Sequence, residues 1–207
     1  MNFLLYVILV QTSISAMAAK FYYFGFGSNM LSKRLHLQNP TAVRIGPGKL
    51  ENFRLDFNLF TDRWYGACAT IVANKGEHVW GAIWELDESD KEHLDNQEGV
   101  HQGIYTPITV SVYCPPLDTM VECRAYQLVE QPDTNLHSLS TNEIPQDRLA
   151  SSTYLKSLVK GAIESEIPFE YVDWLMHIPH NGNTAERFEF ELELDGIELY
   201  NLVEEKM

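Results

Sequence analysis

The chain has 207 residues, of which 45% are hydrophobic, and its 29 acidic and 15 basic side chains give a formal net charge of −14. This acidity would repel a phosphate backbone and argues against a nucleic-acid partner, while the hydrophobic fraction is sufficient for one substantial core. The three cysteines, Cys68, Cys114 and Cys123, form no CxxC pair and are too few for a disulfide framework or a zinc cage. We therefore expect one globular domain without a structural metal.

Residues 1–18 carry no charged side chain and contain an uninterrupted apolar run at 3–10. That run is too short to span a bilayer, so no membrane anchor is predicted. Three interpretations stay open: a cleaved signal peptide, which makes the protein secreted; an upstream extension before a physiological start at Met17, which makes it cytoplasmic; or a short strand. Residues 19–207 are predicted to be a single domain, because no linker, repeat or low-complexity tract interrupts them.

The first two thirds of the domain are rich in strand patterns. Segments with β-branched and aromatic residues, each bounded by Gly, Pro, Asn or Asp, predict strands at 21–26, 50–60, 67–73, 79–86, 104–113 and 121–129. A short helix is predicted over 30–37. A second is predicted over 87–97, with Asp87 as its N-terminal cap and Gly99 as its stop.

The last third changes character after a loop at 131–145. Leucines and Tyr154 recur at helical spacing, and Pro168 suits the first turn of a further helix that ends near His177. Residues 188–194 alternate apolar and acidic residues, which is typical of an edge strand or of a solvated acidic face. Strands followed by helices indicate an α+β fold, and the close strand spacing favours a small, mixed, strongly curved β-barrel flanked by helices.

The first segment with chemical potential is Tyr-Phe-Gly-Phe-Gly-Ser-Asn at 23–29. Two glycines directly after a strand let the backbone turn sharply and expose N–H groups, which favours a bound anion or oxyanion. The segment lacks the third glycine of a dinucleotide fingerprint and the Gly-Lys-Ser/Thr of a phosphate loop, so nucleotide binding is not predicted.

The second segment is Asp-Asn-Gln-Glu-Gly-Val at 95–100. Its Glu98 directly precedes the helix-ending Gly99, near the negative end of the peptide dipoles, where the pKa of a carboxyl is raised toward that of a neutral-pH base. The alternative is a solvated helix end. The scattered histidines, such as His36, His93 and His101, are predicted to lie on the surface without forming a metal site.

Together these two segments resemble the γ-glutamylcyclotransferase family, in which Tyr-Phe-x-x-Gly-Ser-Asn precedes Asn-Gln-Glu-Gly-Val by about seventy residues. Fragments at 50–57, 69–71 and 79–81 support the likeness. The resemblance implies a cofactor-free enzyme with a small β-barrel, a small-molecule γ-glutamyl substrate and frequent homodimer formation. It also implies that Glu98 is catalytic and that the substrate is bound by Tyr23, Phe24, Gly25, Phe26, Gly27, Ser28 and Tyr154.

One residue departs from the family pattern: Phe26 stands where a tyrosine usually precedes Gly-Ser-Asn. The aromatic ring is kept and its hydroxyl is lost, which predicts altered affinity or specificity and does not by itself require loss of catalysis. Tyr23, Tyr105 and Tyr154 are the candidates for a replacement hydroxyl, and packing in the core is the alternative role for Tyr105.

The reaction implied by the resemblance is the attack of a substrate's own α-amino group on its γ-carbonyl, which releases 5-oxoproline and a free amino acid. Two alternatives stay open. One is a related cyclotransferase that acts on γ-glutamylamines or on glutathione. The other is a non-catalytic relative that binds γ-glutamyl ligands.

Overall fold

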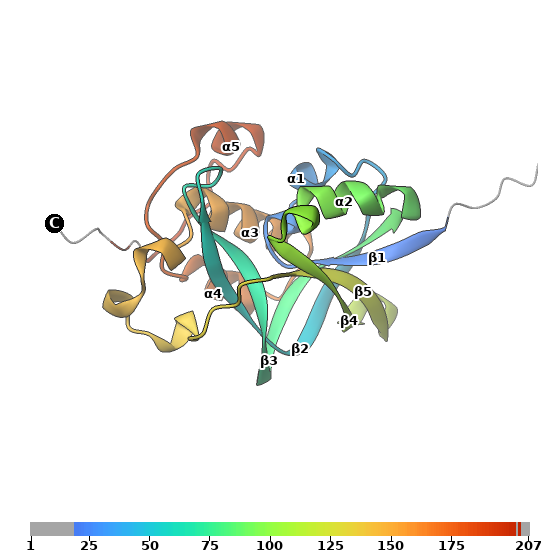
Figure 1. Ribbon diagram of the computed structural model, residues 1–207, viewed down its shortest axis with the longest axis horizontal. Helices are drawn as coiled ribbons and strands as arrows, with labels where there is room; N and C mark the ends of the chain where they lie inside the picture. The colour runs from blue at the N-terminus through green and yellow to red at the C-terminus, as the bar shows by residue number, and fades with distance from the viewer. Residues whose placement is uncertain (1–18, 202, 204–207) are drawn as a thin grey trace, which may run out of the picture.

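The computed structural model describes residues 19–201 and 203, so the predictions made for residues 1–18 lie outside the described part of the chain. Five strands close into a barrel at the centre of the molecule (Figure 1). They are β1 (Lys20–Gly25), β2 (Val43–Thr61), β3 (Gly66–Asp87), β4 (Tyr105–Cys114) and β5 (Thr119–Leu128), in the order β1-β3-β2-β4-β5. The β1–β5 pair is parallel and the other described pairs are antiparallel, so the predicted mixed, curved barrel is confirmed.

The prediction of two separate strands at 67–73 and 79–86 was wrong, because both belong to the 22-residue strand β3. The polar residues at 74–77 between them belong to β3, but they have no partner in the β2 register and form a wide bulge opposite Asn52. The β2–β3 register shifts at three places, two of them beside Asn52 and Leu59, which have left-handed φ angles of 63° and 59°. Such bulges bend a long strand and help it to curve around a small barrel.

The helices are α1 (Ser32–His36), α2 (Lys91–Gln97), α3 (Ser152–Glu164), α4 (Phe169–Met176) and α5 (Glu186–Glu191). The helix predicted over 30–37 is divided at Leu31, whose extended backbone separates a 3-10 turn (Ser28–Met30) from α1. The edge strand considered for 188–194 was also wrong: the segment forms most of α5 and the turn after it, and buries Phe188, Leu192 and Leu194. Within the described residues, no helix has the length and apolar character needed to cross a membrane.

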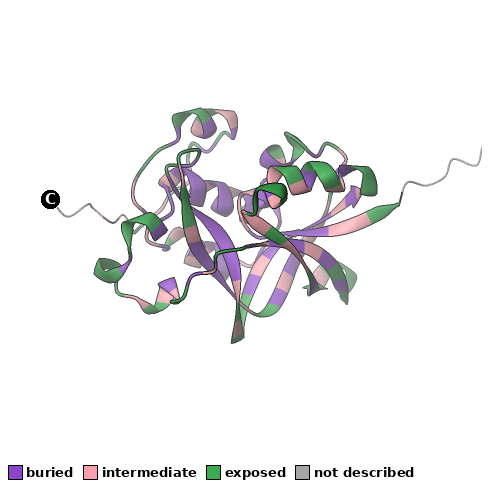
Figure 2. Cartoon of the chain, in the orientation of Figure 1, coloured by how far each residue is buried: buried purple, intermediate pink, exposed green. Residues whose placement is uncertain are grey.

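Buried residues are concentrated along the strands and α3, as Figure 2 shows.

A cluster of buried charged side chains attaches the last third of the chain to the barrel. Asp56, which is completely buried on β2, accepts hydrogen bonds from Arg54 Nε at 2.9 Å and Arg148 Nη2 at 2.6 Å. Because Arg148 also donates to the carbonyl of Phe57 at 3.0 Å, the loop before α3 is fixed to the strand.

Helix α3 packs against the turn that follows β1. Gly161 makes this contact close, since a Cβ atom there would lie 2.6 Å from the backbone nitrogen of Leu31. At the other end of α3, the Ser151 hydroxyl caps the helix by accepting the Tyr154 N–H at 3.1 Å. The packing places Tyr154 beside the Gly27–Ser28 turn.

Candidate functional site

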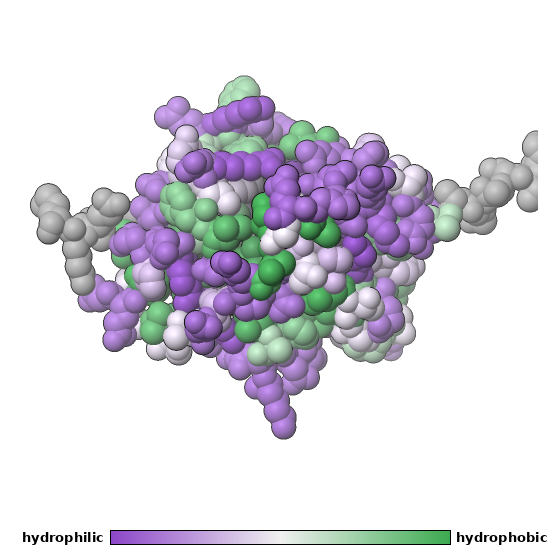
Figure 3. Space-filling view, in the orientation of Figure 1, coloured by the Kyte–Doolittle hydropathy of each residue, from purple (hydrophilic) through white to green (hydrophobic). Residues whose placement is uncertain are grey.

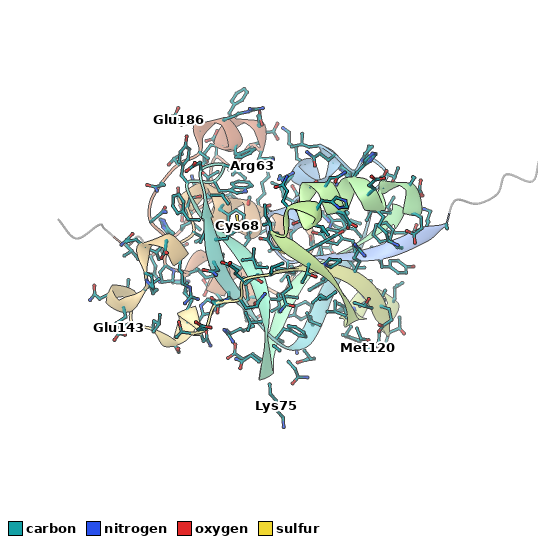
Figure 4. All side chains as sticks on the ribbon, viewed as in Figure 1. Arg63, Cys68, Lys75, Met120, Glu143 and Glu186 are labelled. Carbon is teal, nitrogen blue, oxygen red and sulfur yellow. The ribbon has the colours of Figure 1, made fainter. Side chains whose placement is uncertain are left out.

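A cavity lies where the end of β1, the end of α2 and the start of α3 meet. Its narrow inner cleft has a volume of about 40 Å³, and it adjoins a wider outer chamber of about 340 Å³. The inner cleft is lined by Tyr23, Phe26, Gly27, Ser28, Asn29, Ala69, Glu98, Tyr105, Tyr126 and Tyr154. Five of these residues, Ser28, Asn29, Glu98, Tyr105 and Tyr154, line the outer chamber as well. Arg63 and Cys68 also line the chamber. Figure 4 shows Arg63 near α5 and Cys68 in the middle of the molecule.

Glu98 is held at the end of α2 by the local backbone. It follows the last helical residue, and Gly99 ends the helix with a left-handed φ of 66°, as the sequence predicts. A Cβ atom at Gly99 would lie 2.9 Å from the Ile104 side chain, so both conformation and space favour glycine there. Helix α2 is anchored to β5 because Asp95 accepts hydrogen bonds at 2.6 and 2.8 Å from Arg124 Nη2.

A network of amide side chains orients the Glu98 carboxylate. Asn29 Nδ2 donates to Glu98 Oε1 at 2.7 Å and to the Tyr23 hydroxyl at 3.0 Å. Gln97 Nε2 in turn donates to Asn29 Oδ1 at 2.9 Å, which sets the direction of the Asn29 amide. Glu98 Oε2 accepts no hydrogen bond from the described residues and is the oxygen available to a ligand.

Burial raises the pKa of Glu98 to about 7, and the charge of Arg34 and the hydrogen bond from Asn29 only partly oppose this effect. The predicted direction of the pKa change is therefore confirmed. The main cause of the increase is burial, whereas the sequence predicts it from the negative end of the α2 peptide dipoles. A carboxyl with this pKa exchanges a proton readily at neutral pH, which is the property of a general base that later acts as an acid.

Two tyrosines hold the backbone of Ala69 at the edge of the cleft. The Tyr105 hydroxyl donates to the Ala69 carbonyl at 2.9 Å, and the Ala69 N–H donates to the Tyr154 hydroxyl at 3.0 Å. The Tyr154 hydroxyl also lies beside the Gly27–Ser28 turn. Because that oxygen accepts one backbone N–H, its own proton can be donated into the cavity.

The structure brings together seven of the nine predicted site residues. Tyr23, Phe26, Gly27, Ser28, Glu98, Tyr105 and Tyr154 all line the cleft, whereas Phe24 and Gly25 do not. Phe24 is completely buried in the core, because neighbouring side chains along a strand point to opposite faces. Gly25 is the last residue of β1 and pairs with Ala82 on β3.

Several lining residues were not predicted from the sequence, among them Asn29, Tyr126 and Arg34. Asn29 stands in the motif at 23–29, yet nothing in the sequence distinguished its bond to Glu98 from a helix cap. Tyr126 faces the cleft from β5, with its ring 5.8 Å from that of Tyr23. Arg34 lines the outer chamber from α1, and the sequence shows only one basic residue among others on a short helix.

The remaining candidate groups have no evident chemistry. Cys68 lines the chamber, but burial raises the pKa of its thiol to about 11, so it remains protonated at neutral pH. His36, His93 and His101 are exposed, as predicted. Across residues 19–201 and 203, no group of three or more His, Cys, Asp or Glu side chains is arranged to hold a metal ion.

Comparisons with known proteins agree with the geometry. A family model described as the AIG2-like family matches residues 78–175. The chain is 37% identical to a γ-glutamylcyclotransferase of Bos taurus over 82% of its length and 86% of the relative, and 36% identical to that of Homo sapiens over 80% and 82%. A solved γ-glutamyl cyclotransferase structure has a TM-score of 0.71 and 32% identity, and the match covers 84% of this chain and 99% of that one.

Proposed function

Because the chain belongs to the γ-glutamylcyclotransferase family, we propose that it converts γ-glutamyl amino acids or dipeptides into 5-oxoproline and a free amino acid. The observation that carries this proposal is the Glu98 carboxyl, which has a pKa of about 7 and lies in a cleft beside the Gly27–Ser28 turn. In this proposal Glu98 is the proton carrier of the reaction, and its raised pKa supports that role.

The reaction forms a bond between the substrate's α-nitrogen and its γ-carbonyl carbon, and breaks the amide bond to the leaving amino acid. The α-ammonium must lose one proton before it attacks and a second after the new bond forms. The leaving nitrogen must gain two protons to depart as an ammonium ion. Glu98 Oε2 is placed to accept protons from the first nitrogen and return them to the second, so no net proton is consumed.

Ring closure is intramolecular, so the site has to hold the substrate in a folded conformation and needs no side-chain nucleophile. The N–H groups of Ser28 and Asn29 stand at the start of a 3-10 turn, where helical N–H groups have no earlier carbonyl to bond. Together with the Tyr154 hydroxyl they can stabilise a developing oxyanion or the glutamyl α-carboxylate. Each well-placed donor contributes about 3 kcal/mol to the stabilisation of an oxyanion.

Phe26 packs against the ring of Phe24, with ring centroids 6.2 Å apart, and lines the inner cleft without a hydroxyl. Tyr23 and Tyr154 present hydroxyl groups to the same cleft, which supports retained catalysis. The size of the cavity and the net charge of −14 both favour a small molecule over a nucleic acid as partner. Homodimer formation stays a prediction from the resemblance, and light scattering of the purified protein would test it.

The test is incubation of the purified protein with γ-glutamyl-alanine, glutathione and γ-glutamyl-lysine, followed by measurement of 5-oxoproline. We expect release from γ-glutamyl-alanine to be the fastest. Preferential turnover of glutathione or of the lysine conjugate would instead favour a related cyclotransferase. Binding of all three without any release would indicate a relative that keeps the pocket but lacks catalysis.

A further inference from the structure

The outer chamber contains a buried cation whose side chain has no hydrogen-bond partner among the described residues. Arg34 on α1 is only 4% exposed, and none of its guanidinium nitrogens donates a hydrogen bond to a described residue. Nε and Nη1 are shielded from solvent and unpartnered, whereas Nη2 is not among the shielded atoms. Burying a guanidinium without an acceptor destabilises a protein, so an acceptor supplied by a ligand would explain why an arginine stands there.

Arg148, which is 8% exposed, is a buried arginine with a structural role and can be compared with Arg34. Its guanidinium donates to Asp56, to the carbonyl of Phe57, and to both the hydroxyl and the carbonyl of Thr134. Every nitrogen of Arg148 is therefore used to hold the chain together. Arg34 holds no segment in this way, although it is buried to a similar extent.

The charges around the chamber favour an anion. The charged residues that line it are Arg34, Arg63 and Glu98, so two cations face one carboxylate in a protein whose formal charge is −14. Because Glu98 has a pKa of about 7, it is about half protonated at neutral pH, which makes the chamber more positive still. A negatively charged group that enters this chamber meets a local field opposite in sign to that of the whole molecule.

The position of Arg34 indicates which part of a substrate it meets. Arg34 lines the outer chamber but not the inner cleft, which is formed by the Phe26–Asn29 turn and four tyrosines. Glu98 lines both spaces. The inner cleft, at about 40 Å³, has room only for a few atoms at the reacting end of a substrate, so with the amino group at Glu98 the leaving amino acid extends into the outer chamber of about 340 Å³.

We propose that Arg34 binds the carboxylate of the leaving amino acid, and so makes the site selective for γ-glutamyl amino acids over γ-glutamylamines. This inference rests on the proposed cyclotransferase function. It identifies a specificity-determining residue in the outer chamber, separate from the proton carrier and the backbone donors of the inner cleft.

The test compares γ-glutamyl-alanine with γ-glutamyl-alaninamide, which lacks only the negative charge of the leaving group. We expect the wild-type protein to prefer the acid in kcat/KM by roughly ten- to hundredfold, the range of a charge-assisted hydrogen bond to a carboxylate. In Arg34→Met the preference should fall to about one, and in Arg34→Lys part of it should remain. Arg187→Met, which removes an exposed arginine on α5, is the matched control and should keep the wild-type preference.

Several results would overturn the inference. A preference for the acid that persists in Arg34→Met excludes the contact, and so does a wild-type protein that turns over both compounds equally. If Arg34→Met lowers kcat/KM equally for both, Arg34 acts on the glutamyl half or on Glu98. The ratio of kcat/KM for the acid to kcat/KM for the amide separates these cases, because a change in the ionisation of Glu98 affects the turnover of both substrates equally.

Failure of the proposed function would look different. In that case the wild-type protein releases no 5-oxoproline from any γ-glutamyl compound. Calorimetric binding of the two alanine compounds then tests Arg34 without turnover. Tighter binding of the acid that Arg34→Met abolishes supports the inference, and equal Kd values for wild-type protein and Arg34→Met overturn it.

Discussion

Replacing Glu98 by Gln removes the proposed proton carrier while keeping the shape of the side chain. The new amide oxygen can accept the hydrogen bond from Asn29 that Glu98 Oε1 accepts now, so the cleft should keep its geometry. Among the residues that the structure describes, no other Asp, Glu or His lines either part of the cavity, and burial raises the pKa of both Tyr105 and Tyr154. Without a substitute base, turnover should fall by on the order of 10³-fold.

The same substitution should stabilise the fold at neutral and alkaline pH. Glu98 has a pKa of about 7 in the folded protein against an ordinary value of 4.5, so its ionised form is disfavoured by folding. At about 1.4 kcal/mol per pH unit, the penalty is absent below pH 4.5, grows between pH 4.5 and 7, and levels off above that at up to about 3 kcal/mol. Glutamine carries no charge and avoids this penalty.

The assay pairs 5-oxoproline release from γ-glutamyl-alanine with urea unfolding at pH 5 and pH 8. The control is Glu92→Gln, which makes the same change at an exposed position on α2. We expect Glu98→Gln to show this loss of turnover and to be more stable than wild type at pH 8, with a smaller difference in stability at pH 5. Undiminished turnover would exclude Glu98 from the mechanism, and an unchanged stability at both pH values would refute the argument from burial.

Three further substitutions test the support of the site. Tyr154→Phe removes the acceptor of a buried backbone N–H and should cost about 1–3 kcal/mol of unfolding free energy and lower kcat/KM, whereas Tyr65→Phe at a half-exposed position should change neither. Asp56→Asn should lower the free energy of unfolding in urea by about 3–5 kcal/mol, because it leaves buried guanidinium groups without a counter-charge. Glu51→Gln, which breaks an exposed ion pair, should lower it by under about 1 kcal/mol. Similar losses for the two variants would contradict the role of burial. Gly161→Ala should lower the melting temperature through overpacking worth about 1–3 kcal/mol and slow 5-oxoproline release, although alanine favours helix; a more stable variant would disprove the close contact.

Most strands of the barrel and the helix end that carries Glu98 were predictable because they depend on local signals. Strand patterns bounded by turn residues predicted β1, β4 and β5 closely, and Gly99 predicted the end of α2. The merging of two predicted strands into β3 was not predictable. Its polar middle at 74–77 has no partner in the β2 register and is held by a side-chain contact, in which the Gly76 N–H donates to Asn52 Oδ1, and its own composition gives no sign of a strand.

The edge strand considered after residue 185 was wrong for a related reason. Alternating aromatic and acidic residues at 188–194 suit a strand, yet tertiary packing decides the outcome: the ring of Phe188 stacks on Trp64, with centroids 4.4 Å apart, and helix α5 results. Arg34 shows the same limit at the site. Whether an arginine is buried and unpartnered depends on neighbours from distant parts of the chain, which no local pattern encodes.

Two charged side chains of the site lower the stability of the free protein, and a ligand that carries both an ammonium group and a carboxylate would pair with both of them. Glu98 is buried enough to raise its pKa, and Arg34 is buried without an acceptor, so each charge disfavours the empty folded state. In the proposed complex, the substrate's ammonium group lies at Glu98 and the carboxylate of its leaving half lies at Arg34. Both charges gain partners only when one small molecule carries both groups, so in this proposal the same electrostatics that weaken the free protein select its substrate.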